Sequence, residues 1–152
     1  MSEEVKNLTR SLAFAAAVLF LLGSFTGIYV SAAMSKKIPV NEGAALASHL
    51  NAYLGAFWML GIAWTYQFSG LSIKSMRLLA VVVSVANFSN WLITAVKAAI
   101  LQEGERGVDL VGSAANKGVH VCLIVFVVIP TMVASVMWAW GLRPGAKASE
   151  EA

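Results

Sequence analysis

The chain has 152 residues, of which 59% are hydrophobic and only 12% are charged, and its mean hydropathy is +0.74. Soluble domains carry about 25% charged residues, so this composition excludes an ordinary soluble protein and predicts an integral membrane protein with one domain over residues 1–152. The net charge of +3 comes from scattered loop and terminal residues. That distribution excludes a basic patch for nucleic acid and indicates contact with anionic membrane lipids.

Apolar stretches recur along the chain and predict an all-α fold, an integral membrane four-helix bundle. The expected spans are residues 12–34, 49–68, 78–101 and 119–140. Each is long enough to cross about 30 Å of hydrocarbon at about 1.5 Å per residue. In the first span, Gly23 and Gly27 form a GxxxG pattern, which we expect to serve helix packing within the subunit. In the fourth, Pro130 predicts a kink.

Four spans place both termini on one side of the membrane. The terminal side carries Lys6, Arg10, Lys74, Arg77, Arg143 and Lys147, and the opposite side carries Lys36, Lys37, Arg106 and Lys117. Because cytoplasmic loops are richer in lysine and arginine, this distribution favours cytoplasmic termini. The expected location is a bacterial inner membrane.

A polar stripe runs along the third span. Asn87, Asn90, Thr94 and Lys97 share one helical face within about 80° of arc. Polar side chains inside a membrane are costly, so they usually face the bundle interior and mark a site. The alternatives are that the two asparagines only hydrogen-bond neighbouring helices and that Lys97 extends to the membrane interface.

Further polar residues begin the second and fourth spans, on the side where the third span ends. His49 opens the second span, with Tyr53 one turn later on the same face, and Asn116 and His120 open the fourth. We therefore expect these residues to meet the stripe at one level of the bundle and to line a pocket. His120 can equally be an interfacial residue without a function.

The chemistry of this set is limited. No Asp or Glu lies inside a predicted span, which argues against a proton relay or a proton-coupled exporter. Cys122 is the single cysteine, and no hydrolase or phosphate-binding motif is present. Histidine can act as an acid or base or ligate haem, and amides and hydroxyls can stabilise a polarised oxygen. The set favours an intramolecular rearrangement or a binding site over hydrolysis.

Three ordered motifs resemble those of a known family. They are Ser48-His49-Leu50, Asn90-Trp91-Leu92-Ile93-Thr94 and Trp140-Gly141-Leu142-Arg143. They resemble the hydroxylaminobenzene mutase family, which is similar in plan to styrene oxide isomerase, another small four-span membrane enzyme. The resemblance covers nearly the whole chain, from about Leu12 to Arg143.

The resemblance implies a membrane isomerase or mutase for a small lipophilic aromatic compound. It would convert an arylhydroxylamine to an aminophenol or an aryl epoxide to an aldehyde, without net oxidation. Styrene oxide isomerase is a trimer that uses haem b as a Lewis acid, so the resemblance implies haem b, a homo-oligomer and His49 as the iron ligand. Asn90 and Asn87 would bind the substrate heteroatom, and Thr94 and Tyr53 would line the pocket.

The chain departs from the family pattern at two positions. The family has an asparagine six residues after the histidine, followed by glycine, where this chain has Gly55 and Ala56. Asn51 lies nearby in the sequence but is expected at a different angle on the helix. The isomerase has a tyrosine where this chain, like the mutases, has Thr94.

Two other classes of function stay open from the sequence. In the first, His49 and His120 ligate one haem between them in a non-catalytic subunit for electron transfer. In the second, the protein is structural and its polar stripe only holds helices together.

Overall fold

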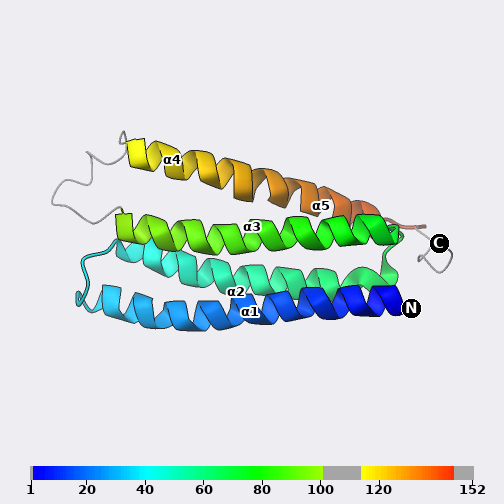
Figure 1. Cartoon of the computed structure of the whole chain (residues 1–152), viewed down its shortest axis with the longest axis horizontal. Coiled ribbons are helices and arrows are strands. Elements are labelled where there is room, and N and C mark those ends of the chain that lie inside the picture. Colours follow the sequence, from blue (N-terminus) through cyan, green and yellow to red (C-terminus); the bar gives the residue numbers. More distant parts are fainter. Residues whose placement is uncertain (1, 101–113, 146–152) are drawn as a thin grey trace.

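The computed structural model describes residues 2–100 and 114–145, which are almost entirely helical and contain no strand. The elements are α1 (Glu3–Met34), α2 (Glu42–Thr65), the short 3-10 helix η1 (Tyr66–Phe68), α3 (Ile73–Ile100), α4 (Ala114–Leu123), the π-helical turn η2 (Ile124–Val128) and α5 (Ile129–Gly141). The segments α4, η2 and α5 follow one another without a break, so four long helices make up the fold (Figure 1). The predicted all-α bundle is confirmed.

The helices extend beyond the predicted spans because charged and capping residues form their first turns. Ser2 caps α1, accepting a hydrogen bond from the backbone N–H of Val5 at 3.4 Å, and Asn41 caps α2, accepting from the N–H of Ala44 at 2.8 Å. Residues 114–118, expected in a loop, form the first turn of α4. Residues 1, 101–113 and 146–152 lie outside the described residues, and so does most of the loop predicted between the third and fourth spans.

Three helices of the described chain are long and apolar enough to cross a membrane: α1, α3 and the continuous helix Ala114–Gly141. Helix α2 does not meet the same criterion of composition, since it carries His49, Asn51 and Tyr53. It has 24 residues, about 36 Å of helix, and it lies alongside the other three over the same length (Figure 1). The chain is an integral membrane protein, and α2 carries most of its polar side chains in its first half.

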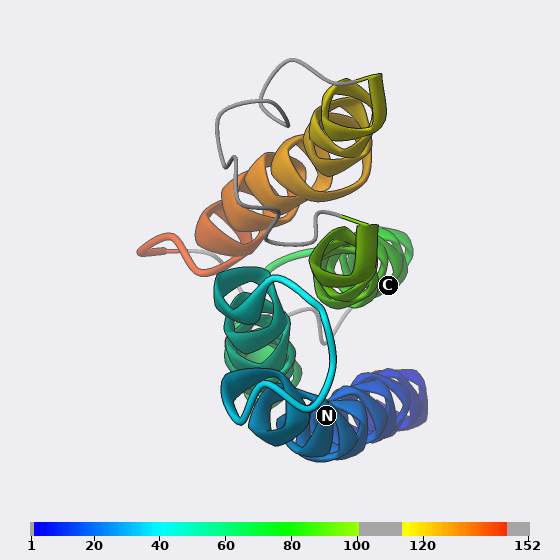
Figure 2. The ribbon, with the colours of Figure 1, turned by 90° about the vertical axis from the view of Figure 1, so that its left-hand side faces the viewer.

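Helix α2 lies between α1 and α3, and the α4–α5 helix packs mainly on α3 (Figure 2). Its α4 end stands away from α1 and α2, whereas its α5 end reaches the turn between α2 and α3 (Figures 1 and 2). The irregularity predicted at Pro130 takes the form of the π-helical turn η2 just before it, in which the N–H of Ile129 donates to the carbonyl of Ile124. Proline has no N–H to give, so a wider turn accommodates it.

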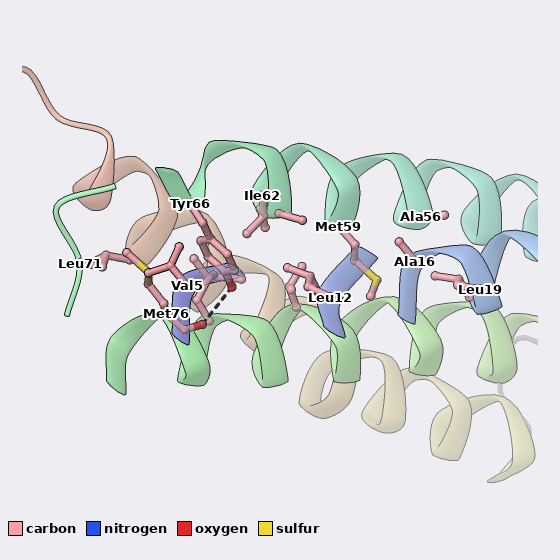
Figure 3. Packing of buried hydrophobic residues seen from close by; sticks show 14 of the residues in the cluster. Val5, Leu12, Ala16, Leu19, Ala56, Met59, Ile62, Tyr66, Leu71 and Met76 are labelled. Atoms are coloured by element: carbon pink, nitrogen blue, oxygen red, sulfur yellow. Dashed lines mark hydrogen bonds between the residues drawn. The ribbon is translucent and has the colours of Figure 1, made fainter. Parts of the chain in front are cut away.

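The larger apolar cluster fills the half of the bundle that contains the α2–α3 turn. Figure 3 shows its side chains converging from α1, α2 and α3. Leu12, Met59 and Leu79 are at its centre, each almost fully buried. Tyr66 closes the end by donating a hydrogen bond from its hydroxyl to the carbonyl of Met76 at 2.9 Å. This cluster holds three helices together over roughly half their length.

A smaller apolar cluster lies at the opposite end, where α1 and α3 end and α2 begins. It consists of Val30, Ala33, Ala44, Ala45 and Ala98. Between the two clusters, each of α1, α2 and α3 contributes buried polar side chains, so the core is interrupted by a polar layer. The polar layer comprises Thr26, Ser48, His49, Asn51, Asn87, Asn90, Trp91 and Thr94.

Candidate functional site

An amide network joins α2 to α3 within the polar layer. The side-chain amide of Asn51 donates to Oδ1 of Asn90 and to Oγ1 of Thr94, both at 3.1 Å. The Thr94 hydroxyl in turn donates to the backbone carbonyl of Asn90. Asn90 and Thr94 are one helical turn apart, so a single side chain on α2 can bind both. The part of the predicted polar stripe that contains Asn90 and Thr94 therefore lies against α2.

Asn87 lies one helical turn before Asn90, at a point where α2 and α3 approach closely. Its amide donates to the carbonyl of Val83 at 2.8 Å, and its side chain covers Gly55. A Cβ atom added at Gly55 would lie 2.5 Å from Oδ1 and 2.9 Å from Cβ of Asn87. Glycine at position 55 is therefore what lets α3 bring Asn87, only 7% exposed, against α2.

His49 lies on the side of α2 that faces α1. Its Nδ1 is 2.8 Å from the carbonyl oxygen of Gly23, and its ring makes an edge contact with Tyr53 at 4.7 Å between centroids. The Tyr53 hydroxyl lies 3.2 Å from Oγ of Ser24. We call the group formed by His49, Tyr53, Gly23, Ser24 and Gly27 the histidine cluster.

The contact with Gly23 determines which ring nitrogen of His49 carries a proton. A carbonyl oxygen can only accept, so Nδ1 donates, and in the neutral imidazole Nε2 then holds a lone pair. Histidines that ligate metals usually donate their other ring nitrogen to a carbonyl or a carboxylate in this way. His49 thus presents a fixed ring with Nε2 available as an acceptor or a ligand.

The glycine pair predicted to mediate packing creates the space for His49. A Cβ at Gly23 would lie 2.9 Å from Cβ of Ala52, and one at Gly27 would lie 3.1 Å from Cε1 of His49. The prediction that this motif packs helices within one subunit is confirmed. A side chain at Gly23 would push α1 away from α2, and one at Gly27 would crowd the ring of His49.

Apolar side chains surround the histidine cluster on the outer surface of α1 and α2. The ring centroid of Phe20 lies 4.5 Å from that of Tyr53 and 5.9 Å from that of Phe57. Leu50 and Leu54 on α2 are exposed. His49 thus offers one imidazole nitrogen, the type of donor that haem iron takes, beside exposed apolar and aromatic side chains.

The histidine cluster and the amide network lie on different faces of α2. His49 and Asn51 are two residues apart, about 200° around the helix, and their partners belong to α1 and α3 respectively. The expectation that His49, Tyr53, Asn90 and Thr94 line one pocket is corrected accordingly. They share a level, but the backbone of α2 separates them within one chain.

His120 does not join His49. It is exposed on α4, which packs on α3, whereas His49 faces α1. Within residues 2–100 and 114–145, no group of three or more His, Cys, Asp or Glu side chains could hold a metal ion. Asn116, by contrast, is buried. The arrangement of two histidines around one iron is thus not found within one chain, because the start of α4 diverges from α2. Lys97 is half-buried in the last turn of α3.

Asn51 is the residue of this site that the sequence reasoning missed. It was expected to lie at a different angle from Gly55, but the two are four residues apart, about 40° around the helix, and both face α3. The four-residue spacing between Asn51 and Gly55 could have shown that Asn51 lies on the same face of α2. This chain lacks an asparagine at position 55 but places another amide one turn earlier on the same face.

The third motif, Trp140-Gly141-Leu142-Arg143, lies at the opposite end of the bundle and is architectural. The carbonyl of Gly141 accepts a hydrogen bond from the N–H of Gly70 at 2.9 Å. A Cβ at Gly141 would lie 2.6 Å from Oγ of Ser69. Arg143 stacks on Trp140 with 4.2 Å from its guanidinium carbon to the ring centroid. The motif fixes the end of α5 against the α2–α3 turn.

The central motif is partly architectural as well. The indole N–H of Trp91 donates to Oγ1 of Thr26 at 2.9 Å, and the Thr26 hydroxyl donates to the carbonyl of Leu22 at 2.7 Å. This bond ties α3 directly to α1 in the polar layer. Together with the amide network it fixes the mutual position of α1, α2 and α3, and hence that of His49.

The sequence model of a family described as styrene oxide isomerase matches residues 8–143. No curated protein and no solved structure gave a match.

Proposed function

Because the chain belongs to the styrene oxide isomerase family, we propose that it is a membrane isomerase that rearranges a small lipophilic aromatic compound, either an aryl epoxide or an arylhydroxylamine. Such a substrate dissolves in the hydrocarbon region and reaches the protein laterally. An epoxide becomes an aldehyde, and an arylhydroxylamine becomes an aminophenol, with the same atoms in substrate and product. The absence of carboxylates from the middle of the described helices agrees with a reaction that needs no relay of protons.

The observation that carries this proposal is the geometry of His49. Its Nδ1 lies 2.8 Å from the carbonyl oxygen of Gly23 and donates to it, so in the neutral ring Nε2 keeps a lone pair, and the ring lies against that of Tyr53. In the proposal, His49 would hold haem b through Nε2, and the bound haem would supply a Lewis acid toward the oxygen of the substrate. Gly23 and Gly27 keep the ring oriented, as outer-shell hydrogen bonds do for metal-ligating histidines.

Tyr53 is the group of the histidine cluster that can donate to a substrate. Its hydroxyl is next to Ser24 and its ring lies against His49 and Phe20. The Ser24 hydroxyl donates to the carbonyl of Phe20, so Tyr53 is the donor in its contact with Ser24. In the proposal, the Tyr53 hydroxyl turns from Ser24 toward the substrate oxygen on which negative charge develops and stabilises it. Phe20 and Phe57 provide the apolar wall for the aromatic ring of the substrate.

The amide network supports the histidine cluster from the other face of α2. Asn90 and Thr94 bind Asn51, and Asn87 packs on Gly55, so these residues set the rotation of α2 and with it the direction of His49. We assign Asn51, Asn87, Asn90 and Thr94 a positioning role within one subunit. A homo-oligomer, a trimer by resemblance, with cytoplasmic termini in a bacterial inner membrane completes the proposal.

Absorption spectroscopy of the detergent-purified protein tests the role of His49. The wild type should show a haem Soret band, His49→Ala should lose it, and His120→Ala should retain it because His120 is exposed on α4. The same samples are assayed for conversion of styrene oxide and of phenylhydroxylamine by chromatography. A protein that binds no haem and converts neither compound would contradict the proposal. Equal loss of the band in both variants would instead support the electron-transfer alternative.

A further inference from the structure

A second feature of the molecule lies between the first halves of α1 and α3, away from His49, which contacts α1 at Gly23. The two helices leave a groove of about 330 Å³ there, lined by residues from both. Its α1 wall is formed by Leu8, Ser11, Leu12 and Ala15, and its α3 wall by Arg77, Ala80, Val81, Ser84 and Val85. All of these residues lie in the first halves of α1 and α3, toward the end of the bundle where the chain begins (Figure 1).

The lining of the groove is amphipathic along its length. Arg77 lies in the second turn of α3 and is the one charged residue among the lining residues. From Arg77 to Val85 the groove continues for about 12 Å along α3, past small and aliphatic side chains. An occupant therefore meets a cation near the membrane surface and an apolar channel deeper in the hydrocarbon region.

We propose that this groove binds one phospholipid with an anionic headgroup, with the phosphate on Arg77 and an acyl chain between α1 and α3. A guanidinium binds phosphate oxygens through paired N–H donors. No acidic side chain lines the groove, so nothing there repels an anion. Basic pockets between membrane helices on the cytoplasmic side are known to bind anionic lipid headgroups.

The site is separate from the proposed isomerase chemistry. It lies beside the larger apolar cluster, where Leu12 packs, whereas the histidine cluster lies beyond that cluster toward the other end of α1. An acyl chain in the groove would fill the space that the divergence of α1 and α3 leaves open. Binding of the lipid should therefore stabilise the bundle without taking part in catalysis.

Native mass spectrometry of the delipidated full chain in detergent, titrated with phosphatidylglycerol or phosphatidylcholine, tests the inference. We expect one tightly bound phosphatidylglycerol per chain and weaker binding of phosphatidylcholine. Arg77→Gln should weaken phosphatidylglycerol binding about fivefold, the usual contribution of one basic residue, and weaken phosphatidylcholine binding less, because the choline charge of that lipid compensates its phosphate. Lys74→Gln is the matched control, because it removes the same charge one turn earlier, outside the groove, and should have little effect.

A second variant tests the apolar part of the groove. Ser84→Leu should fill it and reduce the binding of both lipids, while circular dichroism verifies that the protein remains helical. Equal binding of the two lipids by the wild type, or equal effects of Arg77→Gln and Lys74→Gln, would overturn the proposal. Binding of oleate as tight as that of phosphatidylglycerol would overturn the phospholipid assignment. Dissociation of an oligomer by Ser84→Leu with lipid binding unchanged would show that a second copy occupies the groove.

Discussion

Replacing Gly55 with alanine tests the close approach of α2 and α3 that positions the site. The added Cβ would lie 2.9 Å from Cβ of Asn87 and 2.5 Å from its Oδ1. A side chain can turn its far end away, but its Cβ is fixed to the helix, so α3 must move outward. Overpacking of this kind costs about 1–3 kcal/mol.

The matched control is Gly61→Ala on the same helix. Nothing lies within 4 Å of a Cβ at Gly61, so this change should be neutral or should stabilise by about 0.5–1 kcal/mol through the helix preference of alanine. The helix preference of alanine over glycine contributes equally at position 55 and cancels in the comparison. The difference in unfolding free energy between the two variants therefore isolates the overlap, about 1–3 kcal/mol.

Reversible unfolding in mixed micelles, followed by circular dichroism, measures this difference. A second arm combines Gly55→Ala with Asn87→Ala, which shortens the side chain that meets the new methyl group. The double variant should lose less stability than the sum of the single changes, since the two positions are in contact. The reasoning would be refuted if Gly55→Ala were as stable as Gly61→Ala, because the helices would then not be in close contact at this point.

Two further predictions concern the end of α5 and the amide network. Gly141→Ala should lower stability by about 1–3 kcal/mol, since its Cβ would lie 2.6 Å from Oγ of Ser69, whereas Gly118→Ala meets nothing within 4 Å and should be tolerated; thermal unfolding compares the two. Asn51→Leu and Asn90→Leu should each destabilise by about 0.6–1.7 kcal/mol and reduce turnover to a similar extent, with the double variant no worse than either. A much larger loss of turnover in Asn90→Leu alone, at equal stability, would show that Asn90 contacts the substrate instead of positioning α2.

The fold was predictable because membrane hydrocarbon constrains sequence strongly. Long uncharged stretches indicated the helices, and the glycine pair at Gly23 and Gly27 indicated a close contact, which Ala52 and His49 provide. The helix ends were less predictable. The predicted spans stopped at charged residues, but a helix continues through them when a cap such as Ser2 or Asn41 satisfies its first N–H groups.

The sequence predicted the depth of the site residues in the bundle, but not which neighbouring helix each of them faces. Connectivity alone places the start of α2 beside the end of α3, so the sequence brought His49 and Asn90 to one depth of the bundle. It could not tell which face of α2 each neighbour covers, because α2 carries polar groups on both faces and no single stripe orients it. That choice depends on packing between helices, where Gly55 admits Asn87 and Gly23 admits Ala52.

What the sequence by itself determined is the helical membrane architecture, the polar layer within it and the motif that contains His49. Only the tertiary structure decided that His49 turns toward α1, that Asn51 joins α2 to α3, and that His120 stays apart. The physical reason is that hydropathy and periodicity are properties of one helix, whereas rotation about the helix axis is settled by pairs of side chains on different helices. The fourth helix shows this most clearly, because its sequence predicts a span but only its packing on α3 separates His120 from His49.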